Sequence, residues 1–175
     1  MTAAMSIGRP TTQTQTGTGR FDAPNPASTP MVQLVDETGS RVVDPDFSPQ
    51  LKPAQAVDLL RDMARIRRFD TEATALQRKG QLGLWAPLLG QEAIQVGVRA
   101  ALGPADHVFP SHREHGLALL MGLPVERILA IFKGAEMGDW DAEQLRFHHY
   151  NMVIGAHTLH GVGYAMGQAR DAAAD

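Results

Sequence analysis

A regular spacing of apolar residues between Pro53 and Gly80 constrains the fold more than any other feature of this sequence. The apolar side chains recur every three or four residues, at Val57, Leu60, Met63, Ile66, Phe69, Ala73 and Leu76. This is the period with which one face of an α-helix repeats. Proline suits the first turn of a helix and glycine the position after its last turn, so the segment is predicted to form one long amphipathic helix.

Shorter helices are expected after this one, with little between them that resembles a strand. Their expected positions are 91–102, 114–121, 125–132 and from about Leu159 to Ala173. The polar residues 135–150 are expected to be irregular, and in this part only His107–Phe109 resembles a strand. Because a doubly wound parallel sheet needs more strands than this, we expect a mostly helical part of a larger α/β architecture.

Composition divides the 175 residues into three parts. Residues 1–30 are rich in Thr, Gln, Gly, Pro and Ser and hold almost nothing to bury, which predicts a disordered tail. Residues 31–50 are expected to form an extended arm with a hairpin turn at Asp36–Gly39. Residues 51–175 carry the helices and form the third part.

Composition also excludes several classes of protein. There is no cysteine, so disulfide scaffolds, cysteine-ligated metals and thiol catalysis are excluded. The net charge of −3 gives no reason to expect a nucleic-acid partner. The first residues lack the charged and apolar regions of a secretory signal, and no apolar run approaches the ~20 residues of a membrane span. We therefore expect a cytoplasmic protein with no membrane partner.

Histidine is the one abundant metal-ligating residue type besides the carboxylates, and six of the seven histidines form close pairs along the chain. The pairs are His112 with His115, His148 with His149, and His157 with His160. A zinc or iron site needs three or four converging ligands, and a His-Glu-x-x-His pattern is absent. We expect no metal ligands here and keep a histidine-ligated metalloprotein as an alternative.

Two loops that lead into helices are candidate binding segments. In 109–116 a strand-like piece turns at Pro110 into a helix, and the helix amides with the planar fork of Arg113 could seat a phosphate or a carboxylate. In 154–161 small residues allow a ligand to approach the backbone closely. The glycine-rich and Walker-type phosphate loops are absent, as is the Gly-x-Ser-x-Gly elbow, so those routes to function are not expected.

Four motifs in order give a specific resemblance. They are Ile66–Asp70, Leu89–Ala93, Asp106–Gly116 and Val153–Gly167. Together they resemble the α subunit of the E1 2-oxo acid dehydrogenases, the thiamine-diphosphate enzymes of the pyruvate and branched-chain complexes. The resemblance covers about 31–175, and Gly138–Asp141 with Phe147–His148 is similar to the bacterial branch. It implies the N-terminal part of a transketolase-like, thiamine-diphosphate-binding doubly wound fold.

The resemblance also implies four cofactor-binding residues and no catalytic residue. His112 and Arg113 fall on the family's Tyr-Arg pair at the cofactor diphosphate, with histidine in place of tyrosine. Ile154 falls where a bulky aliphatic residue holds the cofactor in its bent form. Met152 falls where the family uses a small residue whose backbone meets the cofactor.

The remaining implications concern groups outside these residues. The family's Gly-Asp-Gly motif, which holds Mg²⁺ and diphosphate, is expected to begin just beyond Asp175, and the acid that activates the cofactor belongs to the β subunit. The expected reaction is oxidative decarboxylation of a 2-oxo acid, branched-chain before pyruvate, with acyl transfer to lipoamide on the E2 acyltransferase. The expected assembly is α2β2 with E1 β. We expect the 175-residue chain alone to be truncated before this motif and inactive.

A second reading stays open at the level of sequence. The chain could be a non-catalytic helical module for assembly or interaction, derived from such a subunit. The genomic sequence downstream of Asp175 is expected to distinguish the two: a Gly-Asp-Gly motif there would favour an enzyme part, and unrelated DNA would favour the module.

Overall fold

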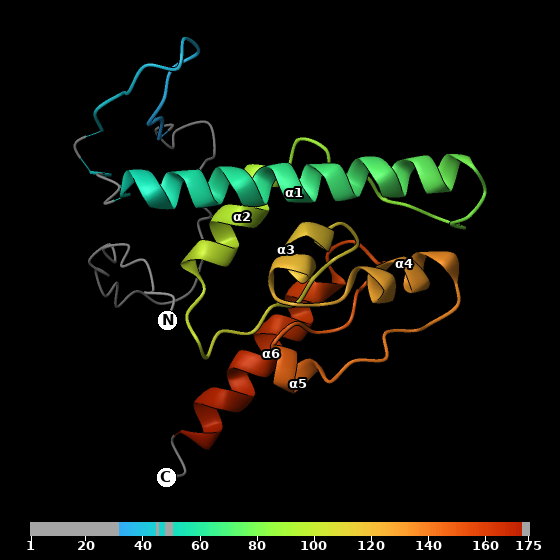
Figure 1. Ribbon diagram of the computed structural model, residues 1–175. Coiled ribbons are helices and arrows are strands. Elements are labelled where there is room, and N and C mark those ends of the chain that lie inside the picture. Colours follow the sequence, from blue (N-terminus) through green and yellow to red (C-terminus); the bar gives the residue numbers. More distant parts are fainter. Residues whose placement is uncertain (1–31, 45, 48–50, 173–175) are drawn as a thin grey trace. The chain divides into compact units, whose positions relative to one another are not determined.

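The computed structural model describes residues 32–44, 46–47 and 51–172. The tail expected over 1–30 lies outside the described residues. The described residues up to Lys52 and those from Pro53 onward belong to two compact units. Figure 1 shows the chain coloured along its sequence.

The described part of the first unit contains a tight turn. Val35 and Arg41 form an antiparallel bridge. Inside it, the Asp36 carboxylate accepts hydrogen bonds from the Thr38 amide at 2.9 Å and from the Ser40 amide at 2.8 Å. The Thr38 hydroxyl donates to the same oxygen, and its hydrogen bond is the main reason that the pKa of Asp36 lies below its usual value. The turn expected from the sequence is present.

The described part of the second unit is built from helices. They are α1 (Pro53–Arg78), α2 (Glu92–Ala101), α3 (His115–Leu120), α4 (Val125–Lys133), α5 (Ala142–Leu145) and α6 (Ala156–Asp171). The expected helices are confirmed, although the last begins three residues earlier than predicted. Across the described residues strand pairing is limited to two isolated bridges, so the mostly helical expectation is confirmed and a doubly wound sheet is not.

The short helix α5 corrects the expectation that 135–150 is irregular. The Asp141 carboxylate accepts a hydrogen bond from the Gln144 amide at 3.0 Å and so caps the first turn. Asp-x-x-Gln is the spacing of a helix-capping pair, a local signal from which this helix could have been expected.

Among the described residues no helix is both long and apolar enough to cross a membrane.

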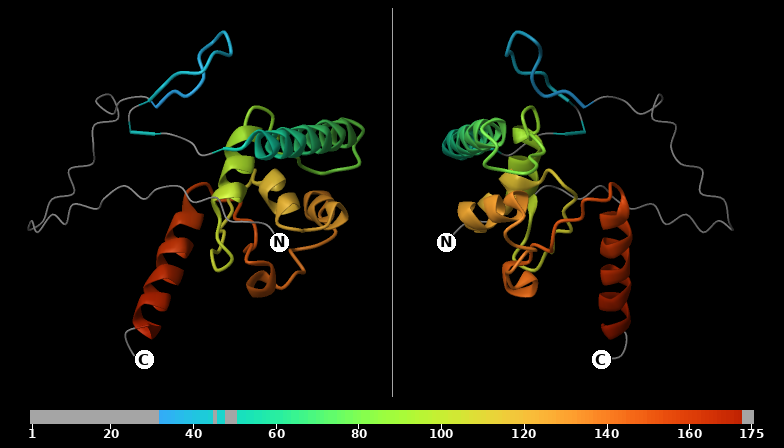
Figure 2. Two further views of the ribbon diagram at one scale, coloured as in Figure 1. Left: turned by 60° about the vertical axis from the view of Figure 1, so that its left-hand side comes forward. Right: turned by 90° about the vertical axis from the view of Figure 1, so that its right-hand side faces the viewer.

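Helix α2 packs against both α1 and α3, and α3 also contacts α4. Figure 1 and Figure 2 show α1 running alongside these shorter helices. One buried apolar cluster consists of Ile66 of α1, Leu88 of the segment before α2, and Val96 of α2. A larger cluster surrounds the rings of Trp85, Phe132 and others, and it holds the loops that lie between the helices in place.

A buried carboxylate fixes the segment between α1 and α2. Asp70 of α1 is 3% exposed. One of its oxygens accepts hydrogen bonds from the Trp85 indole at 2.9 Å and from the Leu88 amide at 3.0 Å. Because both donors are buried, the carboxylate replaces the water that these groups lose on folding.

A second buried polar side chain positions α3. The Gln95 amide group donates to the Arg113 carbonyl at 3.0 Å and accepts from the Leu117 amide at 2.9 Å. The close approach depends on Gly116, because a Cβ atom there would lie 2.8 Å from Cδ1 of Ile66 and 2.9 Å from Oε1 of Gln95. Gly116 therefore sets how closely α3 lies against α1 and α2.

We expect Gly116→Ala to lower the free energy of unfolding by about 2 kcal/mol, since overpacking forces a well-packed core to shift. Gly97→Ala is the matched control, because Gly97 is an exposed helical glycine with no atom within 4 Å of the added Cβ. Alanine should stabilise α2 there by roughly 0.5–1 kcal/mol. Urea denaturation of both variants checks the pair, and equal effects would contradict the packing argument.

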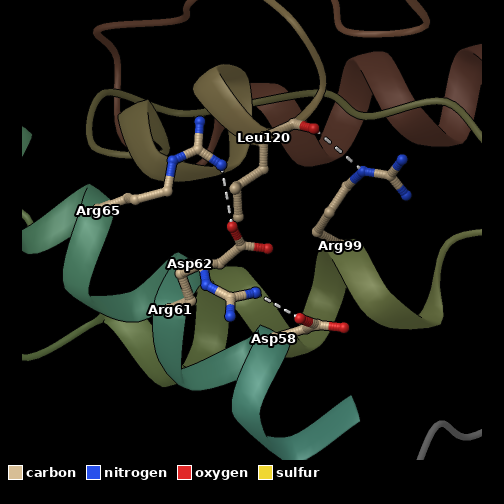
Figure 3. A network of polar contacts seen from close by, with 6 residues as sticks. All are labelled: Asp58, Arg61, Asp62, Arg65, Arg99 and Leu120. Atoms are coloured by element: carbon tan, nitrogen blue, oxygen red, sulfur yellow. Dashed lines mark hydrogen bonds and ion pairs between the residues drawn. The ribbon is translucent and has the colours of Figure 1, made fainter. Parts of the chain in front are cut away.

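Charged side chains on the outer face of α1 contribute less to the stability of the fold than the buried contacts. Figure 3 shows two ion pairs there, Arg61 with Asp58 at 2.6 Å and Arg65 with Asp62 at 3.0 Å. Pairs of this kind on an exposed helix face are worth only ~0.3–0.5 kcal/mol. Figure 3 also shows the Arg99 side chain donating to the Leu120 carbonyl at 3.3 Å, which joins α2 to the end of α3.

Helix α6 is 16 residues long and none of them is buried, a property that it shares with the four-residue α5. It contacts Phe109 through Tyr164, and Phe109 also lies where a side chain at Gly161 would point. The large apolar side chains Leu159 and Val162 are exposed, as is Met166. A contiguous row of exposed apolar side chains is typical of a surface at which proteins interact.

Candidate functional site

The candidate site lies where two distant segments of the chain run side by side. Val108 and Phe147 form an isolated parallel bridge. The Val108 amide donates to the Arg146 carbonyl at 2.9 Å, and the His148 amide donates to the Val108 carbonyl at 2.8 Å. Phe147 is fully buried and anchors the bridge in the larger core cluster. The bridge therefore fixes the direction in which both candidate loops leave the core.

A backbone hydrogen bond then joins the two loops. The Asn151 amide donates to the Ser111 carbonyl at 3.2 Å. His112 and Arg113 follow Ser111 directly, and Met152 and Ile154 follow Asn151. The structure thus brings together the two loops that carry the four predicted cofactor-binding residues.

The Arg113 side chain is held in one orientation. Its Nε and one terminal nitrogen donate to the Pro87 carbonyl, at 2.9 Å and 2.5 Å. The other terminal nitrogen makes neither bond and the bonded one keeps a second hydrogen, so the end of the fork stays available to a ligand. The Arg113 backbone amide donates to the Glu114 carboxylate at 3.2 Å, and α3 is only six residues long. The predicted contribution of helix amides to an anion site is therefore not supported, and the guanidinium is the group that can bind an anion.

The other three predicted residues offer one polar and two apolar side chains. Nδ1 of His112 is 3.0 Å from the Ser111 hydroxyl, which leaves the far edge of the ring for other partners. Met152 is 45% exposed and Ile154 is 76% exposed. Met152 also lines a mostly apolar cavity of about 430 Å³, together with Phe132, Trp140 and Tyr150.

A buried histidine, His115, makes hydrogen bonds that hold residues next to both loops. Nε2 of His115 lies 3.0 Å from the Ala86 carbonyl and therefore donates its proton there. Nδ1 is then the acceptor, so the Tyr150 hydroxyl, 3.3 Å away, donates to it. Burial lowers the pKa of His115 to about 4 and raises the pKa of Tyr150 well above its usual value. His115 is therefore neutral at pH 7 and fixed in one tautomer.

Neither the contact of His115 with Tyr150 nor the hydrogen bond of Arg113 to the Pro87 carbonyl was expected from the sequence. His115 and Tyr150 are 35 residues apart, and Arg113 and Pro87 are 26 apart. Contacts at such separations are set by the fold, and neither residue type nor local spacing signals them. Tyr150 could have been suspected only as a large side chain beside a candidate loop.

The dehydrogenase E1 component family matches residues 61–174, and the chain belongs to this family. It is 34% identical to the 3-methyl-2-oxobutanoate dehydrogenase subunit alpha of Mycobacterium tuberculosis (strain ATCC 25618 / H37Rv) over 148 residues, which are 80% of this chain and 40% of that protein. It is 33% identical to the pyruvate dehydrogenase E1 component subunit alpha of Staphylococcus aureus (strain Mu50 / ATCC 700699) over 135 residues, 77% of this chain and 36% of that protein.

These matches confirm the predicted resemblance to E1 α subunits. The chain spans about 40% of the length of the curated relatives that it matches. The matched residues of the family include both loops of the candidate site.

Proposed function

We propose that this chain contributes the diphosphate-facing loops of a thiamine-diphosphate-dependent E1 α subunit. The observation that carries the proposal is the hydrogen bond between Asn151 and Ser111. It places the guanidinium-bearing loop and the aliphatic loop next to each other in a chain of the E1 family. A cofactor with an anionic end and an aromatic end needs these two kinds of surface side by side.

The residues present fit such a cofactor. Arg113 offers a planar cationic fork that matches a phosphate, and the Pro87 carbonyl already holds it in place. His112 can donate one further hydrogen bond to a phosphate oxygen. Ile154 is an exposed apolar side chain that can pack under the cofactor rings, and the backbone at Met152 can meet the cofactor. Bound thiamine diphosphate supplies the thiazolium electron sink that decarboxylation of a 2-oxo acid requires.

The substrate proposal is a branched-chain 2-oxo acid first and pyruvate next. The apolar cavity beside Met152 supports this order, because a branched aliphatic chain fills apolar space that the methyl group of pyruvate leaves empty. The acyl group then passes to lipoamide on an E2 acyltransferase. A relative of each substrate class matches the chain to nearly the same degree.

The partner proposal is an E1 β subunit in an α2β2 assembly. The exposed apolar row on α6 supports a large covered surface there. We place the Mg²⁺ ligands and the acid that activates the cofactor outside the residues of this chain, and we expect the isolated chain to be inactive. The complete subunit would have the doubly wound thiamine-diphosphate-binding fold and work in the cytoplasm.

Arg113→Lys tests the proposal, because lysine keeps the charge and loses the fork. Thiamine diphosphate with Mg²⁺ is titrated calorimetrically into the chain mixed with its β subunit. We expect the variant to bind the cofactor at least about tenfold more weakly, which corresponds to one charge-assisted bidentate contact. Arg65→Lys is the control, since Arg65 is an exposed arginine of α1 paired only with Asp62 in the described part of the chain.

Equal cofactor affinity of the Arg113→Lys variant and the native chain would contradict the role of Arg113. Absence of cofactor binding by a well-formed α–β complex would instead favour the non-catalytic module. Circular dichroism of both variants checks that the helices remain folded.

A further inference from the structure

A cluster of three potential metal ligands lies on the other side of the bridge from the core. Nδ1 of His107 is 3.1 Å from Nε2 of His148. A carboxylate oxygen of Glu143 lies beside the same His107 ring, 4.0 Å from its other nitrogen, Nε2. Each residue offers one ligand atom, and these atoms all lie within 4.8 Å of one another. The cluster is separate from the loops that carry Arg113 and Ile154.

The parallel bridge places the two histidines on one face. Side chains alternate along an extended segment, so residues on either side of a bridged pair point away from that pair's side chains. Phe147 points into the core and is fully buried. His107 and His148 flank the bridged residues Val108 and Phe147, and their rings therefore meet on the opposite face, 41 residues apart in sequence.

Aromatic packing orients both imidazoles. The ring of Phe109 stacks on His148 with centroids 3.9 Å apart and planes at 11°. Tyr164 of α6 lies 4.8 Å from the His107 ring, measured between centroids. The His107 side chain is only 13% exposed. Rings that are held in this way lose little freedom when they bind an ion, which favours coordination.

The separation of the two ring nitrogens matches one shared ion. Zinc binds imidazole nitrogen at ~2.0–2.1 Å in tetrahedral geometry, which puts two ligand nitrogens about 3.3 Å apart. The 3.1 Å between His107 and His148 therefore needs only a few tenths of an ångström of opening. Glu143 is the exposed member, with 68% of its side chain accessible, and can turn its carboxylate toward the ion from α5.

The chemistry of the set also suits a divalent ion of the zinc type. Two neutral imidazoles and one carboxylate are a common ligand set for zinc, with a water molecule in the fourth position.

We propose that His107, Glu143 and His148 form a binding site for one divalent transition-metal ion such as Zn²⁺. The site joins α5 to the bridged segments and to the face covered by α6. The spacing of the histidines along the chain gave no reason to expect a histidine site. This cluster takes its two histidines from two different segments, so that spacing could not indicate it.

The test is a titration of the full, metal-free chain with Zn²⁺ in competition with a chromophoric chelator. We expect one equivalent to bind with a dissociation constant of about 1 μM or lower. Glu143→Gln and His148→Gln should each weaken binding by at least about tenfold. Co²⁺ in place of Zn²⁺ should give the visible absorption of a tetrahedral ion, which both variants lose.

Matched controls come from neighbouring residues of the same type. His149→Gln changes the exposed histidine next to His148, and Glu126→Gln changes an exposed first-turn glutamate of α4. Both should bind Zn²⁺ like the native chain. Glu143 is exposed, so its variant keeps the test valid if His148→Gln fails to fold. A native chain that binds no Zn²⁺, or equal losses in His148→Gln and His149→Gln, would overturn the proposal.

Discussion

Replacing Asp70 with alanine is expected to lower the free energy of unfolding by about 4 kcal/mol, because a buried donor that loses its acceptor costs ~1–3 kcal/mol and this carboxylate serves two. The Trp85 indole and the Leu88 amide both donate to one oxygen of Asp70 in a part of the core that water does not reach. Alanine would leave both donors unpaired and open a small void between α1 and the segment that follows it. Urea denaturation followed by circular dichroism measures the loss.

Two further variants distinguish the effect of the lost hydrogen bonds from the effect of the lost charge and from the effect of removing any carboxylate from α1. Asp70→Asn keeps an acceptor oxygen in the same place, so we expect it to retain most of the stability. Asp58→Ala removes an exposed carboxylate from the same helix and should cost no more than about 0.5 kcal/mol. If Asp70→Ala does not fold at all, the comparison of Asp70→Asn with Asp58→Ala still tests the idea. An Asp70→Ala variant as stable as Asp58→Ala would contradict it.

The helices were predictable because their signals are local. The period of the apolar residues in α1, the proline at its start and the glycine shortly after its end are all read within one segment. The short helix α5 was missed although its capping pair, Asp141 and Gln144, is also local. Four residues are too few for a period to show, so only the cap could have indicated this helix.

The candidate site was predictable only as a set of residue types. The resemblance placed His112, Arg113, Met152 and Ile154 in two loops, and the structure brings those loops together. It could not indicate that the Pro87 carbonyl orients the Arg113 side chain. Nor could it indicate that the Glu114 carboxylate accepts the hydrogen bond of the Arg113 amide, which an anion was expected to accept. Such contacts depend on how α2 and α3 pack, which Gln95 and Gly116 control from outside both loops.

The second large effect concerns pH and arises from His115. Its pKa is about 4 in the folded chain, mainly because burial disfavours the charged ring, and 6.5 is its ordinary value. The unfolded chain therefore binds a proton at this residue between these two values while the folded chain does not. The contribution of His115 to the free energy of unfolding is fully present above pH 6.5. It is lost as the pH is lowered toward 4, and the loss is about 3 kcal/mol in total.

His115→Gln isolates this effect, because glutamine does not titrate. We expect the variant to be less stable than the native chain at pH 7, since it loses ring contacts with Trp85 and Phe132. Its stability should change much less between pH 6.5 and pH 4, so the two curves converge as the pH falls. Glu92 also makes the stability depend on pH, but only below its ordinary pKa of 4.5, because its hydrogen bond with Arg67 lowers its pKa in the folded state. This effect is the same in the native chain and in the variant. The difference between the native and variant curves therefore reports His115 alone. Parallel curves across this range would show that the buried ring is not what makes the fold sensitive to acid.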